Sequence, residues 1–222
     1  GLDVLLDTIR SIPGFADLEH KESPADGMPF KRTKVLLKKE IVTMKVPDID
    51  PNHIVGTYIA PQDWNQLLAD PDTVLIDTRN DFEVRYGTFT NAINPETRSF
   101  GEFPAWFDAH SQDFAGKKIA MFCTGGIRCE KASAYMLHRG FRNVYHLEGG
   151  IIHYTRQARE QGLSNRFIGK NFVFDERMGE RISNEVISVC HQCGNPSDRH
   201  VNCANDDCHL LFIQCEECAE EH

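Results

Sequence analysis

The sequence has no apolar run as long as a membrane span, no Gly-x-Gly-x-x-Gly motif and no secretory signal peptide. The first absence argues against a membrane partner, and the second against the glycine-rich fingerprint that binds dinucleotides. A two-histidine, one-carboxylate iron set is not evident either, although ligands far apart in sequence could still form one. Because a starting Met is also absent, we expect a piece of a longer protein, located in the cytoplasm.

Basic residues are fewer than acidic ones: 24 Lys and Arg stand against 33 Asp and Glu, a formal net charge of −9. This balance argues weakly against a nucleic-acid partner, but a local basic strip could still carry one. Such a strip occurs early in the chain, at Lys31, Arg32, Lys34, Lys38, Lys39 and Lys45. Its simpler interpretation is the solvated face of a strand pair.

Six of the eight cysteines lie between Cys190 and Cys218. Without a signal peptide, metal thiolates in a reducing compartment are a better interpretation than a disulfide scaffold. Two Cys-x-x-Cys pairs about twenty residues apart predict a tetrahedral zinc site of Cys190, Cys193, Cys215 and Cys218. Cys203 and Cys208, with His200 and His209 nearby, could hold a second ion, join the first site or stay free.

The stretch 118–133 predicts a buried strand, a glycine-rich loop and the start of a helix. Cys123 falls where the strand ends, and Gly125 and Gly126 allow backbone N–H groups to turn inward. The start of the helix adds a partial positive charge and Arg128 a full one. Each of these contributions lowers the pKa of the thiol and favours the nucleophilic thiolate. The alternative is a small buried cysteine that closes a tight turn.

Predicted strands and helices alternate along the middle of the chain. Strands are expected at 73–77, 119–122 and 143–147, and helices at 61–69, 81–86, 103–107, 130–139 and 151–161. Such alternation predicts an α/β fold, with a parallel sheet, right-handed crossovers and flanking helices. Because sites in such folds gather at the carboxyl ends of the strands, the loops after Asp77, Cys123 and Leu147 should surround one pocket.

Three regions are expected along the chain. Residues 1–46, with a predicted strand over Val35–Val46, are interpreted as the remnant of an N-terminal α+β domain. Residues 47–165 form the central α/β domain. Residues 166–222 form a C-terminal, Cys-rich zinc-binding region, and the mixed aromatic and basic segment 165–182 at its start is expected to be a hairpin.

Four motifs of the central region resemble those of rhodanese-like domains. They are Asp77-Thr78-Arg79 with Glu83 and Gly87, Ala92-Ile93-Asn94-Pro95, the loop Cys123-Thr124-Gly125-Gly126-Ile127-Arg128, and Leu147-Glu148-Gly149-Gly150-Ile151. In rhodaneses the cysteine carries a persulfide at the floor of a six-residue loop, and Cys123 to Arg128 matches that length. Cysteine phosphatases instead need C-x5-R, and the position of that arginine is occupied here by Cys129.

The chain as a whole resembles the bacterial tRNA uridine hydroxylases. The stretches that carry this resemblance are Lys38–Thr43, Cys123–Ser133 and the cysteine pattern from Cys190 to Cys215. It implies oxygen-dependent hydroxylation of C5 of uridine at the wobble position, position 34, with tRNA as partner and molecular oxygen as co-substrate. Most of the N-terminal domain of that family is absent from the sequence.

The resemblance suggests roles for individual residues. We hypothesise that the Cys123 thiolate adds to C6 of uridine, while Arg128 and the loop N–H groups hold the thiolate and stabilise charge on the pyrimidine. The proposed loop set is Thr124, Gly125, Gly126, Ile127, Arg128 and Arg79, although Arg79 and Asp77 could simply form a structural ion pair. The candidates for contact with the RNA backbone are Lys31, Arg32, Lys34, Lys38, Lys39, Arg166 and Lys170.

Two other functions remain open at the level of sequence. A sulfurtransferase would carry a persulfide on Cys123, and Cys129 could resolve it. A binding module without catalysis would keep the zinc region and an inert loop, and low reactivity of the Cys123 thiol would support it. Cys129 could also be only a packing residue at the start of a helix.

Overall fold

The computed structural model describes residues 1–20, 22, 27–28, 35–175, 177–205, 207–208 and 210–221. The chain divides into two compact units, residues 1–33 and 34–222. In the described part of the first unit, the regular element is the helix α1 (Leu2–Arg10), which is followed by turns. No helix within the described residues has the length and apolar character needed to cross a membrane.

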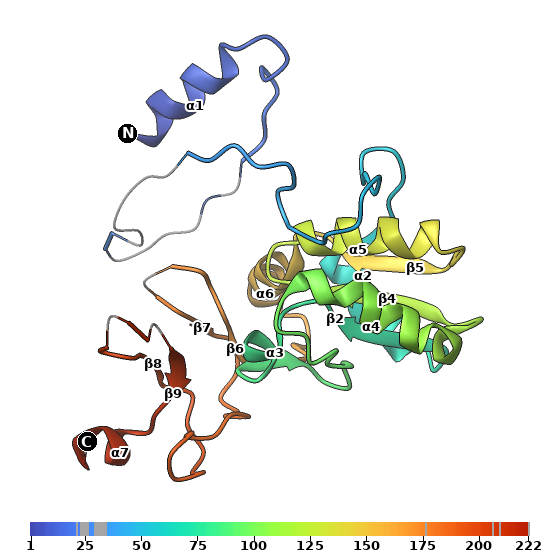
Figure 1. The fold of residues 1–222 in the computed structure, drawn as a ribbon. Coiled ribbons are helices and arrows are strands. Elements are labelled where there is room, and N and C mark those ends of the chain that lie inside the picture. The colour runs from blue at the N-terminus through green and yellow to red at the C-terminus, as the bar shows by residue number, and fades with distance from the viewer. Residues whose placement is uncertain are drawn as a thin grey trace. The chain divides into compact units, whose positions relative to one another are not determined.

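A four-stranded parallel sheet forms the centre of the second unit (Figure 1). The strand order is β1 (Thr57–Ile59), β5 (Val144–Leu147), β4 (Lys118–Phe122) and β2 (Thr73–Asp77). The register of β2 and β4 places Asp77 opposite Phe122, the residue before Cys123. The predicted parallel α/β sheet is therefore confirmed, and Asp77 and Cys123 lie at the same edge of it.

Helices cover both faces of the sheet, as the alternation of side chains along β4 requires. Ile119 and Met121 point into one core, which they share with α4 (Phe103–His110) and α5 (Ile127–His138). Ala120 and Phe122 point into the other, which they share with α2 (Pro61–Ala69) and α6 (Gly150–Gln161). Short helical elements connect this frame: α3 (Asp81–Val84), η1 (Phe100–Glu102) and η2 (Ser111–Phe114).

A second, antiparallel sheet joins the central region to the C-terminal one. Its strands are β3 (Gly87–Phe89), β6 (Phe167–Asn171) and β7 (Glu180–Arg181). The pairing of β6 with β7 confirms the hairpin predicted over 165–182. Gly169 lies opposite Gly87, and a Cβ on Gly169 would lie 2.3 Å from the carbonyl oxygen of Tyr86, so this crossing requires glycine.

The end of the chain is a small hairpin followed by a helix: β8 (His200–Asn202), β9 (Leu211–Ile213) and α7 (Glu216–Glu221). Ile213 of β9 packs with Tyr86 and Phe172 in a cluster separate from the two main cores. The salt bridge of Lys170 in β6 with Asp198 also ties this region to the second sheet.

The strand predicted over Val35–Val46 is wrong, because this segment is irregular in the structure. Its alternating pattern has another cause. Met44 is fully buried, and Val42 and Val46 pack against the same core, so these alternate apolar residues cover the sheet and helices instead of pairing with a strand. The carboxylate of Glu40 anchors the segment, since it pairs with Lys131 of α5 and accepts the N–H of Met44.

Candidate active site and metal centre

Cys123 follows the last residue of β4 and lies at the floor of a tight loop that leads into α5. Gly126 adopts a φ of +99°, a conformation that side chains rarely tolerate, and its N–H donates to Cys123 Sγ at 3.1 Å. The thiol is buried, with 2% of Cys123 exposed, whereas Thr124 and Gly125 above it are partly exposed. The predicted loop therefore forms, with at least one N–H aimed at the sulfur.

The first turn of α6 braces this loop. The N–H groups of Ile151 and Ile152 donate to the carbonyl oxygens of Cys123 and Thr124, at 3.0 and 3.2 Å. Gly150 has a φ of +64°, and a Cβ there would lie 2.5 Å from the Cys123 carbonyl oxygen. The two chain segments can approach so closely only because residue 150 has no side chain.

The surroundings of Cys123 favour its thiolate. Burial alone would raise the pKa of this thiol. The hydrogen bond from the Cys129 thiol, the charge of Arg128 and the N–H groups of Cys129 and Gly126 outweigh that cost, and together they lower the pKa to about 6. Burial and the neighbouring thiolate raise the pKa of Cys129 well above its ordinary value, so Cys129 stays protonated and can donate. Thr78 Oγ1 lies 3.4 Å from Cys129 Sγ and helps to position it.

Arg128 is fixed by Glu83, a residue to which the sequence motifs gave no role of its own. Both Nη atoms of Arg128 donate to the Glu83 carboxylate, at 2.6 and 2.8 Å, and Nη2 also donates to Thr124 Oγ1 at 3.3 Å. The Glu83 side chain is fully buried and that of Arg128 is 11% exposed. Burial alone would lower the pKa of Arg128, but the hydrogen bonds and charge of Glu83 outweigh it, raise the pKa above its ordinary value and keep the guanidinium charged next to the thiol.

Glu83 also belongs to a capping box, which could have revealed it from sequence. Its Oε2 accepts the N–H of Asn80 at 3.1 Å, and the N–H of Glu83 donates to the main-chain carbonyl oxygen of Asn80 at 2.9 Å. An Asn followed three residues later by Glu is the pattern typical of such a helix start. One carboxylate thus fixes both the start of α3 and the arginine of the Cys123 loop.

Arg79 lies in the core, where its guanidinium binds Asp77 and the carbonyl oxygen of Gly87, both at 2.6 Å from Nη2. The side chains of Arg79 and Asp77 are fully buried, and Thr88 Oγ1 also donates to Asp77. Arg79 Cζ lies 5.7 Å from the centre of the Phe122 ring. These contacts link β2 to β3 and leave no part of the Arg79 side chain exposed.

The predicted zinc ligands converge. The sulfur atoms of Cys190, Cys193, Cys215 and Cys218 all lie within 4.8 Å of one another, and the Cys193 and Cys215 sulfurs are 3.6 Å apart. A tetrahedral site with zinc–sulfur bonds of about 2.3 Å has sulfur–sulfur edges of about 3.8 Å, so the four thiols fit a zinc ion. None of the eight cysteines is in a disulfide. This cluster could hold a metal.

Cys203 and Cys208 lie outside this cluster, near the turn that joins β8 to β9. Cys203 donates its N–H to Leu210 and is half-buried, whereas Cys208 is exposed. His209, considered with them, lies outside the described residues.

The candidate RNA contacts are distributed over several segments. Lys38 and Lys39 are exposed, and Arg166 is half-buried just before β6. Lys170 Nζ lies 2.9 Å from Asp198, so its charge is already paired. Three further candidates, Lys31, Arg32 and Lys34, lie outside the described residues.

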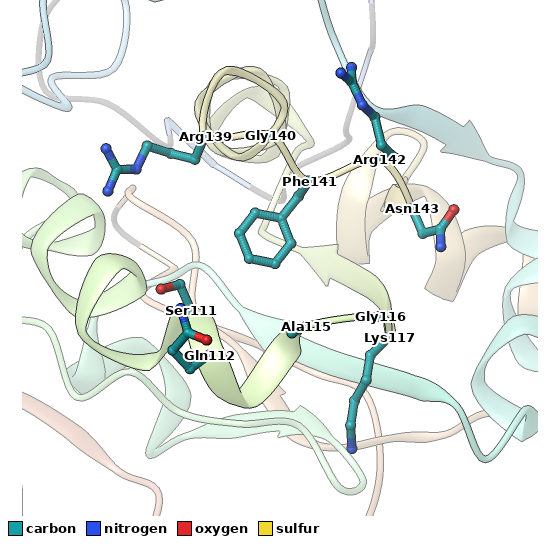
Figure 2. Close-up of a pocket in the computed structure, with 10 residues that line it drawn as sticks. All are labelled: Ser111, Gln112, Ala115, Gly116, Lys117, Arg139, Gly140, Phe141, Arg142 and Asn143. Atoms are coloured by element: carbon teal, nitrogen blue, oxygen red, sulfur yellow. The ribbon is translucent and has the colours of Figure 1, made fainter.

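A pocket of about 510 Å³ lies at the opposite end of the sheet from Cys123 (Figure 2). It is formed where α5 ends and β4 begins, and Figure 2 shows the Phe141 ring near its centre, with Lys117, Arg139 and Arg142 around it. None of the predicted site residues lines it. This pocket therefore does not lead to the Cys123 thiol, which is reached through the Cys123 loop.

Residues 60–157 match the rhodanese-like domain family, and residues 168–222 match the rhodanase C-terminal family. The chain therefore contains a rhodanese-like domain, as its fold and loop indicate. Over 197 residues it is 55% identical to the tRNA uridine(34) hydroxylase of Yersinia enterocolitica, a match that covers 87% of this chain and 56% of that protein. The protein of the same name from Yersinia pestis is also 55% identical, with 87% and 55% covered.

These similarities confirm the resemblance to the tRNA uridine hydroxylase family. The chain spans about half the length of the curated relatives it matches. Among solved structures, a Rhodopseudomonas palustris protein described as a possible tyrosine phosphatase is 28% identical, with a TM-score of 0.41 over 50% of this chain and 85% of that one.

Proposed function

We propose that this chain carries the catalytic thiol of a tRNA uridine(34) hydroxylase, an enzyme that places an oxygen atom on C5 of the wobble uridine. The observation that carries the proposal is the state of Cys123. Its buried sulfur accepts an N–H at 3.1 Å, lies in the field of Arg128 and has a pKa lowered to about 6. Such a thiol is a thiolate at neutral pH and is ready to act as a nucleophile.

The thiolate would add to C6 of the uracil ring, and the electron pair of the C5–C6 bond would move toward O4 to make C5 nucleophilic. C5 would then take an oxygen atom from a donor at the peroxide level, formed from molecular oxygen and a two-electron reductant. Loss of the C5 proton and release of the sulfur would restore the ring, with water as the second product. The loop N–H groups would stabilise the transient charge.

The other parts of the chain would support this reaction. A zinc ion held by the four clustered cysteines would stabilise the C-terminal region, whose own apolar core is small. Lys38, Lys39 and Arg166, together with Lys31, Arg32 and Lys34, would contact the phosphate backbone. The wobble base is unpaired and can turn out toward the thiol. An enzyme with this substrate would act in the cytoplasm.

Nucleoside mass spectrometry of tRNA from cells that lack the gene tests the proposal. A wild-type copy should restore 5-hydroxyuridine at position 34, and a Cys123→Ser copy should not. Cys208→Ser, at an exposed cysteine away from the loop, is the matched control and should restore it. An anticodon stem-loop with 5-fluorouridine should also form a covalent adduct through Cys123. Full activity of Cys123→Ser would exclude this role of the thiol.

A sulfurtransferase is the second candidate, because rhodaneses carry their persulfide at the floor of a loop of this length. The test is the mass of the intact protein after treatment with thiosulfate. A gain of one sulfur atom that cyanide removes, together with unchanged tRNA nucleosides in the deletion strain, would favour sulfur transfer over hydroxylation.

A further inference from the structure

Phe174 is an exposed aromatic residue beside the Cys123 loop. Of the phenylalanines that the structure describes, only Phe15 and Phe174 are exposed, and 60% of Phe174 is accessible. An aromatic ring in water costs free energy unless something covers it. Phe174 belongs to the C-terminal region, yet it lies against a residue of the rhodanese-like domain.

That residue is Arg128. Its Cζ lies 5.9 Å from the centre of the Phe174 ring, within the range of a cation–π contact. The same guanidinium lowers the pKa of Cys123 and holds Thr124. Ile127, its neighbour in the loop, is 49% exposed. One arginine therefore connects the nucleophilic sulfur with an open aromatic and apolar surface.

The position of Phe174 is fixed by two rings beneath it. Phe172 and Phe82 lie 5.0 and 6.4 Å from it, at interplanar angles of 81° and 87°. Phe172 in turn packs with Tyr86 and with Ile213 of the C-terminal hairpin. The packing of the metal-binding region thus determines where the exposed ring stands, because β9 carries Ile213 and ends next to Cys215.

We propose that Phe174 is a stacking surface for an unpaired nucleobase of the tRNA anticodon loop, which it holds within reach of the Cys123 thiolate. This inference rests on the proposed function. Every base has a face that can stack on an aromatic ring, and the guanidinium of Arg128 over the Phe174 ring favours an electron-rich partner on the ring. The polar, partly exposed loop atoms beside the ring would then meet the edge of the base.

The test is binding of an anticodon stem-loop RNA to the whole protein, with Cys123→Ser as background so that no product forms. Loss of one stacked base should weaken binding by about 5- to 150-fold in Phe174→Ala. Phe174→Tyr should retain binding, and Phe174→Leu should lose most of it, because an aromatic face and not only apolar bulk is required. Phe15→Ala removes the other exposed phenylalanine and should leave binding unchanged.

Activity and fluorescence give independent measurements. In the Cys123-containing protein, Phe174→Ala should raise KM, and the thermal midpoint should stay close to that of wild type. Phe174→Trp should lose fluorescence when the stem-loop binds. Wild-type affinity in both Phe174→Ala and Phe174→Leu would overturn this inference and leave the hydroxylase proposal intact. Failure of the unsubstituted protein to bind or modify tRNA would overturn both.

Discussion

Replacement of Glu83 by Gln should destabilise the protein more than any other single change of a charged residue in the Cys123 loop and its supports. The Glu83 side chain is fully buried and forms two hydrogen bonds with Arg128, and it also accepts the N–H of Asn80. Gln keeps the shape but removes the charge. Arg128, only 11% exposed, would then be a buried cation without a counter-ion.

The size of the effect follows from this geometry. Removal of one partner of a buried ion pair costs about 3–5 kcal/mol. Because Gln retains one oxygen that can accept from Arg128, we expect the lower end, about 3 kcal/mol. For a chain of this size, that corresponds to a fall in the thermal midpoint of about 6–12 °C. Replacement of both partners, Glu83→Gln with Arg128→Met, should cost less than Glu83→Gln alone, since no unpaired charge remains.

Urea unfolding and thermal melting measure these differences. The matched control is Arg85→Gln, which breaks the Asp81–Arg85 pair of the same helical turn, where Arg85 is 63% exposed. Exposed pairs contribute about 1 kcal/mol or less, so Arg85→Gln should be nearly neutral. A loss below 1 kcal/mol in Glu83→Gln, or a double variant less stable than the single one, would refute the reasoning.

Four further predictions concern the loop and the metal centre. Alkylation of Cys123 by iodoacetamide, followed by peptide mass spectrometry, should increase with pH around a midpoint near 6, and the midpoint should rise in the Glu83→Gln, Arg128→Met variant. The folded pKa of Cys123 lies below its ordinary value of 9.0, so its thiolate stabilises the native state fully above pH 9, and this contribution should be lost as pH falls through 6. The free energy of unfolding, measured relative to Cys123→Ser, should therefore change with pH by no more than about 1.4 kcal/mol per pH unit. Gly150→Ala should destabilise the protein by about 2–4 kcal/mol in urea unfolding and slow alkylation, whereas Gly125→Ala, whose Cβ would meet no atom within 4 Å, should cost under about 1 kcal/mol. Removal of metal by a chelator should increase hydrogen exchange in β8, β9 and α7 but leave exchange in β2 and β4 unchanged. Cys190→Ser should have the same effect, whereas Cys208→Ser should not. Equal exchange with and without chelator would contradict a structural metal.

The sequence was sufficient for the features that depend on local patterns. The buried strands β2 and β4, the glycine-rich loop after Cys123 and the convergence of two Cys-x-x-Cys pairs each have a short signature. Long apolar runs and fixed cysteine spacing leave few alternatives. The parallel pairing of the strands, though not their order in the sheet, then followed from the alternation of strands and helices.

Features that depend on contacts between distant segments could not be predicted in this way. The alternation of Val42, Met44 and Val46 indicated a strand, because burial against a helix and pairing in a sheet leave the same pattern. β3 has three residues, too few for any periodicity. The contact of Arg128 with Phe174 joins positions in two regions of the chain, and nothing local to either indicates it.

The irregular segment before β1 has a consequence for how the protein can be divided. Its Met44 fills space in the same core as Met121 and Phe103, and its Glu40 supplies the counter-charge of Lys131 on α5. A cut at residue 47, the predicted domain boundary, would leave a void in the interior and an unmatched ammonium group on α5, the helix that follows the Cys123 loop. We therefore expect a stable fragment of this fold to begin upstream of Glu40, because the segment packs as part of the compact unit that starts at Lys34.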